Sequence, residues 1–185
     1  MNTVYTCFCT DVIHDGHLNI IKEAHKYGKV IVGALSDNAL IRYNKFPTVS
    51  LEERIRLYQN LKYVEKVVVQ NHIMYDEVIE QIQPDYVVHG DNWKEGPESA
   101  IRENVQKLLK SYGGKLIEVG YTYNPIVKKI DQQLKEKLAM PEYRRKRLRQ
   151  LIEMCSIVKT IEAHSGLTGL IAEKTVIEHD SKLDQ

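Results

Sequence analysis

The sequence predicts an α/β fold in which a parallel five-stranded sheet is doubly wound by helices and is followed by a helical C-terminal extension. Three observations predict it. Of the 185 residues, 43% are apolar and 28% are charged, so the chain can bury a core. Over residues 1–120, short apolar runs alternate with segments of helical periodicity. The runs are almost continuously apolar, which is typical of parallel strands that are covered on both faces and joined by helical crossovers.

The strands and helices follow one another in strict alternation. Strands are predicted at the apolar runs 4–9, 30–35, 66–70, 86–89 and 116–119. Helices are predicted between them at 18–27, 51–61, 75–82 and 98–112. Ser50 and Glu53 form the sequence of a capping box at the second helix, and Gly113 ends the last one. This order is that of a Rossmann-like doubly wound sheet.

The charge distribution separates the chain into two parts. Residues 1–125 hold 14 Lys and Arg against 16 Asp and Glu, whereas residues 126–185 hold 12 against 9. A helix is predicted from Pro141, and its basic run 144–149 contains no interleaved aromatic residue. We interpret this run as a solvated helix face, with RNA binding as the minor alternative.

The overall charge and the N-terminal residues exclude several kinds of protein. The formal net charge of +1 gives no general attraction to nucleic acid or anionic lipid. No run approaches the roughly 18 to 20 consecutive apolar residues of a membrane span, and the first residues lack the features of a signal peptide. We therefore expect a cytoplasmic protein that binds neither nucleic acid nor membrane.

The most informative residues are His14, Gly16 and His17, at the junction of the first predicted strand and helix. Ligands of doubly wound sheets bind at the carboxyl ends of strands. There the unpaired N–H groups and the dipole of a helix N-terminus favour a phosphate, and Gly16 would let the backbone approach it. Two imidazoles can also donate hydrogen bonds where negative charge develops during phosphoryl transfer. The spacing predicts an anion site that performs such chemistry, and an ordinary pair of surface histidines is the alternative.

Residues 10–18, TDVIHDGHL, resemble the signature of the HxGH nucleotidyltransferases, and in particular that of the cytidylyltransferases. Residues 51–54, LEER, are similar to the family's helix that carries a phosphate-binding arginine. Residues 89–93, HGDNW, are similar to the GDDW segment of its nucleotide pocket. The resemblance extends over about residues 4–123.

The resemblance implies that an acceptor phosphate or phosphonate oxygen attacks the α-phosphorus of CTP and releases pyrophosphate. Mg²⁺ would enter with the triphosphate rather than bind a protein cage, and the protein would be a homodimer. The implied catalytic residues are His14, His17, Lys45 and Arg54. The implied nucleotide-binding residues are Thr10, Asp11, Gly16, Gly90, Asp91, Trp93 and Lys128. Arg54 could instead serve only an ion pair on its helix, and Trp93 could instead pack in the core.

The chain departs from the family pattern in two places. Phe8 stands where most members have a glycine. After the last strand, the family has a Gly-Ile-Ser-Ser/Thr-Thr segment that holds the triphosphate, whereas residues 121–129 read YTYNPIVKK and leave no hydroxyl in that role. Triphosphate binding would then depend on Lys128 or Lys129. A catalytically weak or inactive nucleotide-binding or dimerisation module is therefore the alternative function.

Residues 148–176 resemble the opening segment of phosphoenolpyruvate mutases, some of which are fused behind an HxGH nucleotidyltransferase domain. We therefore expect a nucleotidyltransferase domain at 1–139. Residues 140–185 would be a linker helix and the start of a mutase-like domain that is truncated before its barrel, loose or helical in structure. The mutases imply a small phosphonate as acceptor, in phosphonate biosynthesis. Glycerol 3-phosphate or phosphocholine as acceptor, or adenylyl transfer from ATP, are the alternatives.

Overall fold

The computed structural model consists of two compact units, Met1–Arg147 and Leu148–Gln185. It describes residues 1–10, 12–42, 47, 49–96, 98–120, 122, 129, 136, 140–154, 157–158, 160 and 162–174.

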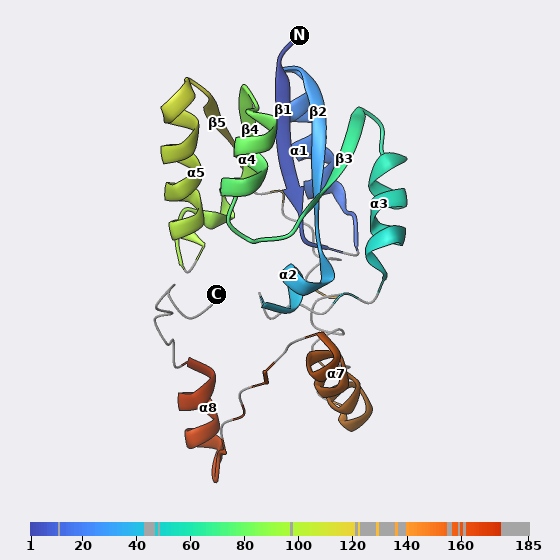
Figure 1. The fold of residues 1–185 in the computed structure, drawn as a ribbon, viewed down its shortest axis with the longest axis vertical. Coiled ribbons are helices and arrows are strands. Elements are labelled where there is room, and N and C mark those ends of the chain that lie inside the picture. The colour runs from blue at the N-terminus through green and yellow to red at the C-terminus, as the bar shows by residue number, and fades with distance from the viewer. Residues whose placement is uncertain are drawn as a thin grey trace. The chain divides into compact units, whose positions relative to one another are not determined.

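The first unit is built on five parallel strands, as predicted (Figure 1). The strands are β1 (Thr3–Phe8), β2 (Lys29–Leu35), β3 (Val64–Gln70), β4 (Tyr86–Gly90) and β5 (Lys115–Val119). Their order is β3-β2-β1-β4-β5, and every pair of neighbours is parallel. The order reverses between β1 and β4, and ligands of such sheets bind outside the carboxyl ends of the strands at that point.

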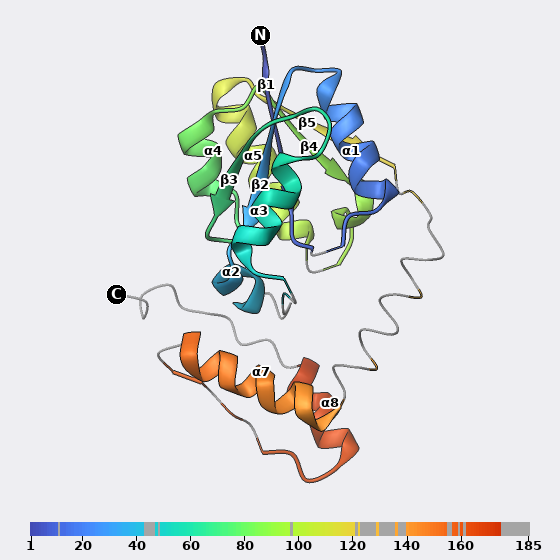
Figure 2. The ribbon, with the colours of Figure 1, turned by 90° about the vertical axis from the view of Figure 1, so that its right-hand side faces the viewer.

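Helices cover both faces of the sheet, which confirms the doubly wound fold. They are α1 (Asp15–His25), α2 (Asp37–Arg42), α3 (Leu51–Gln59), α4 (Asp76–Ile82), α5 (Ser99–Tyr112) and the 3₁₀ helix η1 (Asp91–Trp93). The hydrophobic cluster on one face is completed by α1 and α3, and the cluster on the other face by α4 and α5. Figure 2 shows α1 and α4 on opposite sides of the strands.

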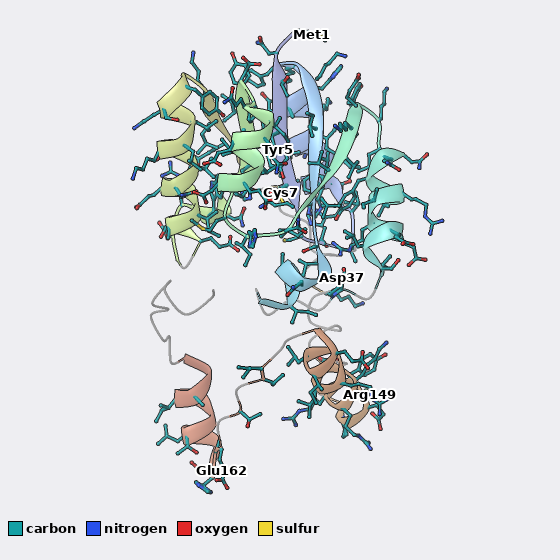
Figure 3. All side chains as sticks on the ribbon, viewed as in Figure 1. Met1, Tyr5, Cys7, Asp37, Arg149 and Glu162 are labelled. Carbon is teal, nitrogen blue, oxygen red and sulfur yellow. The ribbon has the colours of Figure 1, made fainter. Side chains whose placement is uncertain are left out.

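Alternate residues of the central strand β1 enter the two clusters. Val4 and Phe8 pack with α1 and α3, whereas Tyr5 packs with α4 and α5. Tyr5 lies in the middle of the sheet (Figure 3), and its hydroxyl donates to Gln70 Oε1 at 2.5 Å. A Cβ atom at Gly33 on the neighbouring strand would lie 1.8 Å from this hydroxyl, so only glycine fits there.

The structure differs from the sequence prediction mainly at the ends of elements. The first helix begins at Asp15 rather than at residue 18, because His14 caps it. The third strand begins at Val64 rather than at residue 66, because Val64 already pairs with Val30 of β2. Helix α2 was not predicted, because its six residues are too few for a periodic signal.

The described residues after 139 are largely helical. Helix α7 runs from Pro141 to Met154, which confirms the helix predicted from Pro141, and the described side chains of its basic run are exposed. Helix α8 (Gly166–Lys174) is capped by Ser165, whose Oγ accepts from the N–H of Thr168 at 3.2 Å. In the part of the chain that the structure describes, no helix is long and apolar enough to cross a membrane.

Candidate active site

The two histidines of the predicted motif meet at the start of α1. His14 is the N-cap residue, in an extended conformation, and His17 lies in the first turn. Their ring centroids are 4.0 Å apart. The rings of Phe8 and His17 pack edge to face with their centroids 4.9 Å apart, so Phe8 supports the second imidazole.

Backbone hydrogen bonds define which ring nitrogens carry protons. Nδ1 of His14 accepts from the N–H of Gly16 at 3.1 Å, and Nδ1 of His17 accepts from the N–H of His14 at 3.4 Å. A neutral imidazole that accepts through one nitrogen is protonated on the other. We therefore assign the proton to Nε2 in both rings. Both can act as hydrogen-bond donors through that atom.

Gly16 lies directly against the imidazole of His14. Its N–H group donates to Nδ1 of that ring at 3.1 Å. A Cβ atom at position 16 would lie 2.9 Å from Cε1 of His14 and 3.0 Å from its Nδ1. Glycine is thus required here because the imidazole of His14 folds over the backbone.

A cavity of about 220 Å³ opens beside the histidine pair, at the carboxyl ends of β4 and β5. It is the place that the reversal of strand order predicts for a ligand. Of the predicted site residues, it brings together His14, Gly16, His17, Gly90 and Asp91. Its remaining lining residues, which the sequence analysis did not identify, are Ile20, Asn92, Val119, Gly120 and Thr122.

Thr122 is the described residue in the segment 121–128 after β5. Residues 123–128, where the sequence departs from the family's serine and threonine segment, lie outside the described residues. In the structure the Thr122 residue lines the cavity, and its Oγ1 accepts from Asn19 Nδ2 of α1 at 3.0 Å. A hydroxyl group is therefore present at this end of the sheet, held by the helix that carries His17.

Arg54 is fully buried and lies away from the cavity lining. Its Nη1 donates to the carbonyl oxygen of Leu35 at 2.6 Å, and its Nη2 pairs with Asp37 at the start of α2. The ion pair therefore joins α3 to α2 instead of lying along the surface of α3. In this arrangement the guanidinium holds the carboxyl end of β2 and the segment that follows it.

Trp93 is also in the core, only 1% exposed, and does not line the cavity. Its ring stacks on His89 at 3.7 Å, and its Nε1 donates to Glu118 Oε1 at 2.9 Å. The hydrogen bond from Arg102, and then the one from Trp93, hold the pKa of Glu118 below its ordinary value. This geometry is that of a residue packed in the core, the alternative role given for Trp93.

Thr10 shapes the loop that leads from β1 to His14. Its Oγ1 accepts from the N–H of Val12 at 3.0 Å, which closes a short turn. The hydroxyl of Tyr58 donates to the carbonyl oxygen of Thr10 at 2.5 Å, and burial raises the pKa of this phenol well above its ordinary value. Asp11, Lys45 and Lys128, the other predicted site residues, lie outside the described residues.

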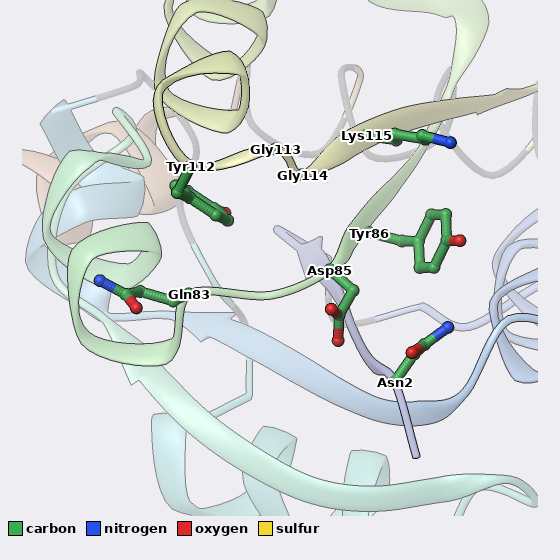
Figure 4. Close-up of a pocket in the computed structure, with 8 residues that line it drawn as sticks. All are labelled: Asn2, Gln83, Asp85, Tyr86, Tyr112, Gly113, Gly114 and Lys115. Carbon is green, nitrogen blue, oxygen red and sulfur yellow. The ribbon is translucent and has the colours of Figure 1, made fainter.

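A second cavity, of about 250 Å³, lies at the amino ends of β4 and β5 (Figure 4). The C-terminal caps of α4 and α5, Gln83 and Gly113, line it in left-handed conformations. Asp85 and Lys115 contribute one charge of each sign, so the helix ends decide its electrostatic preference. Helix C-termini carry partial negative charge and disfavour a phosphate. Of these two cavities, the one beside His14, at a helix N-terminus, is therefore the better candidate for an anion.

Among the described residues, no three His, Cys, Asp or Glu side chains form a group that could hold a metal ion. Asp91 is the carboxylate in the described lining of the cavity beside His14.

The sheet and the imidazole pair at its switch point form the arrangement that the resemblance to the HxGH nucleotidyltransferases predicts. The sequence profile described as "Cytidylyltransferase-like" matches residues 5–150, and the chain belongs to this family.

Two curated proteins are similar to this chain over part of their length. The "Bifunctional protein HldE" of Gluconobacter oxydans is 34% identical over 119 residues, which is 63% of this chain and 24% of that protein. The "Ethanolamine-phosphate cytidylyltransferase" of Arabidopsis thaliana is 30% identical over 95 residues, which is 48% of this chain and 23% of that protein. The chain therefore spans about a quarter of the length of these relatives.

Solved structures confirm the fold. A lipopolysaccharide core biosynthesis protein from Thermoplasma volcanium superposes with a TM-score of 0.57 at 22% identity, covering 67% of this chain and 99% of that one. Pantothenate synthetase from Thermus thermophilus superposes with a TM-score of 0.50 at 11% identity, covering 67% of this chain and 57% of the other. At these identities the likeness is one of fold alone.

Proposed function

We propose that this domain transfers CMP from CTP to a small phosphonate or phosphate, with release of pyrophosphate. The observation that carries the proposal is the pair His14 and His17, whose rings lie 4.0 Å apart beside the cavity at the start of α1. Membership of the cytidylyltransferase-like family supports CTP as the nucleotide.

In the proposed reaction, an anionic acceptor oxygen attacks the α-phosphorus and the bond from that phosphorus to the bridging oxygen of pyrophosphate breaks. Because the acceptor is already an oxyanion at neutral pH, no side chain has to remove its proton. Negative charge accumulates on the oxygens of the α-phosphate and of the leaving group. The Nε2–H groups of His14 and His17 donate to these oxygens, and the dipole of α1 adds to the stabilisation.

Mg²⁺ enters as part of the substrate, bound to the triphosphate, whose charge it neutralises. Nδ1 of each imidazole accepts a backbone N–H, so this atom does not compete for the metal ion. Asp91 and the Thr122 hydroxyl offer oxygen atoms on the cavity wall.

For the acceptor we propose a small phosphonate, such as an aminoethyl- or hydroxyethylphosphonate. The likeness of residues 148–176 to the opening segment of phosphoenolpyruvate mutases supports a place in phosphonate biosynthesis. The named activity of the Arabidopsis relative makes ethanolamine phosphate the reference acceptor in any test. Glycerol 3-phosphate and phosphocholine complete the panel.

The test is pyrophosphate release by the full chain with CTP, Mg²⁺ and this panel of acceptors. We expect the highest kcat/KM with a phosphonate, and a competing excess of ATP should have little effect. His14→Ala should lower kcat by about 10²- to 10³-fold, the usual loss when a donor to transition-state charge is removed. His72→Ala, in the exposed loop after β3, is the matched control and should retain full activity. Equal turnover in both variants would contradict the proposal.

A weak or inactive nucleotide-binding module is the second candidate, because residues 123–128 lack the family's serine and threonine segment. It predicts calorimetric binding of CTP without pyrophosphate release at high enzyme concentration.

A further inference from the structure

The carboxylate of Glu118 links the two walls of the cavity beside His14, although it lies on the opposite face of the sheet. Glu118 precedes Val119 and Gly120, which line the cavity. Because side chains alternate along a strand, Val119 packs in the cluster of α1 while Glu118 faces α5. Glu118 therefore does not line the cavity, although it belongs to the same strand end.

The opposite wall of the cavity is anchored to this carboxylate through Trp93. Gly90, Asp91 and Asn92 line the cavity, and the next residue, Trp93, turns back into the core beneath α5. The indole Nε1 donates to Glu118 Oε1 at 2.9 Å. The three lining residues are thus held between strand β4 and a buried side chain on the other face.

Arg102 of α5 fixes the orientation of the carboxylate. Its Nε donates to Oε1 of Glu118 at 2.8 Å and its Nη2 donates to Oε2 at 3.0 Å, while Lys94 Nζ lies 3.9 Å from Oε2. The side chain of Glu118 is 17% exposed. A bidentate, charge-assisted pair of this kind has a specific geometry and is stronger than hydrogen bonds between neutral groups. The pair holds the carboxylate of Glu118 in the position in which its Oε1 accepts the hydrogen bond from the indole of Trp93.

We infer that Glu118 is a positioning residue that sets the separation of the two nucleotide-binding walls, residues 90–92 and 119–120. The inference rests on the proposed function, since it concerns the nucleotide of that reaction. Glu118 acts on the affinity for the nucleotide and leaves the chemistry at His14 and His17 in place. Its loss lets the 3₁₀ turn η1 move away from β5 and widens the cavity.

The test compares Glu118→Gln with the wild-type full chain, using Mg·CTP as the probe. Glutamine keeps an acceptor for the indole but cannot form the charged bidentate pair with Arg102. We expect the KM and the calorimetric Kd for CTP to rise about tenfold, because a shift of the wall misplaces the ligand, with kcat within about twofold of wild type. The control is Glu65→Gln, which removes the same charge from an exposed strand ion pair with Lys29 and should change neither constant.

The molecule also contains a reporter for this anchor, because Trp93 is its single tryptophan. In Glu118→Gln the emission of the indole should move to longer wavelength and become more accessible to acrylamide. Arg102→Gln should have the same effects on KM and emission. The double variant should lose little more than either single variant, because the two side chains act as one unit.

Three results would overturn the inference. The first is an unchanged KM and an unchanged tryptophan emission in Glu118→Gln. The second is a lower melting temperature with an unchanged Kd for CTP, which describes a purely structural ion pair. The third is a wild-type chain that binds no nucleotide, which refutes the proposed function as well. If wild type binds CTP without turnover, the proposed transfer fails while the comparison of Kd values still decides the role of Glu118.

Discussion

Replacing Gly16 by alanine separates the effect of the histidine geometry on catalysis from its effect on stability. The new Cβ atom would lie 2.9 Å from Cε1 of His14, a distance that forces the imidazole to move. His14 then loses the hydrogen bond from the N–H of residue 16, at 3.1 Å in the wild type, and leaves its place beside the cavity.

The expected stability change is small because two terms oppose each other. Loss of the N-cap hydrogen bond costs about 1 kcal/mol. Alanine in place of glycine within α1 stabilises the helix by up to about 1 kcal/mol. The free energy of unfolding should therefore change by less than about 1 kcal/mol. The turnover number should nevertheless fall by about 10²-fold, since a displacement of about 1 Å is enough for a loss of that size.

The assay for Gly16→Ala is pyrophosphate release beside urea denaturation of the same preparation. Gly166→Ala is the matched control, because it places the same methyl group at the start of α8 with no atom within 4 Å. Retention of at least half of the wild-type kcat in Gly16→Ala would refute the argument that the glycine serves the imidazole.

Two further predictions concern the ion pairs of Arg54 and Glu118. Arg54→Met should lower the free energy of unfolding in urea by about 3 kcal/mol, because it removes the partner of Asp37 and of the Leu35 carbonyl from a fully buried position; a loss below about 1 kcal/mol would contradict it. The second prediction follows from the lowered pKa of Glu118, whose main cause is the hydrogen bond from Arg102. The unfolded chain binds this proton at higher pH than the folded chain, so the stabilisation is present above the ordinary pKa of 4.5 and is lost as the pH falls through the folded value. Thermal melts across this acid range should show a weaker pH dependence in Glu118→Gln than in wild type, and identical slopes would exclude the ion pair as a source of acid sensitivity.

Those parts of the site that depend on residues close together in the sequence could be predicted from it. His14 and His17 belong to one helix turn, so their spacing alone brings the rings together. Ser50 and Glu53 form the predicted capping box, with Ser50 Oγ accepting from the N–H of Glu53 at 3.3 Å. Gly90 ends the strand β4 and Asp91 follows it, and the carboxyl end of a strand near the switch point is the expected place for a ligand.

Contacts between distant segments could not be predicted in this way. Arg54 pairs with Asp37, 17 residues earlier, and the sequence offers closer carboxylates on its own helix. Thr122 meets Asn19 across 103 positions. The pattern of the chain contains no signal for either contact, because each depends on which elements become neighbours.

The sequence by itself determined the strands, the helices other than α2 and the histidine motif of this cytidylyltransferase-like domain, because hydrophobic period, caps and turn residues act over a few positions. Only the tertiary structure decided what surrounds that motif. It placed Trp93 in the core and brought the carboxylate of Glu118 to its indole from a strand 25 residues later. The physical reason is that backbone hydrogen bonds between strands set the order β3-β2-β1-β4-β5. This order decides which side chains meet at the carboxyl edge of the sheet.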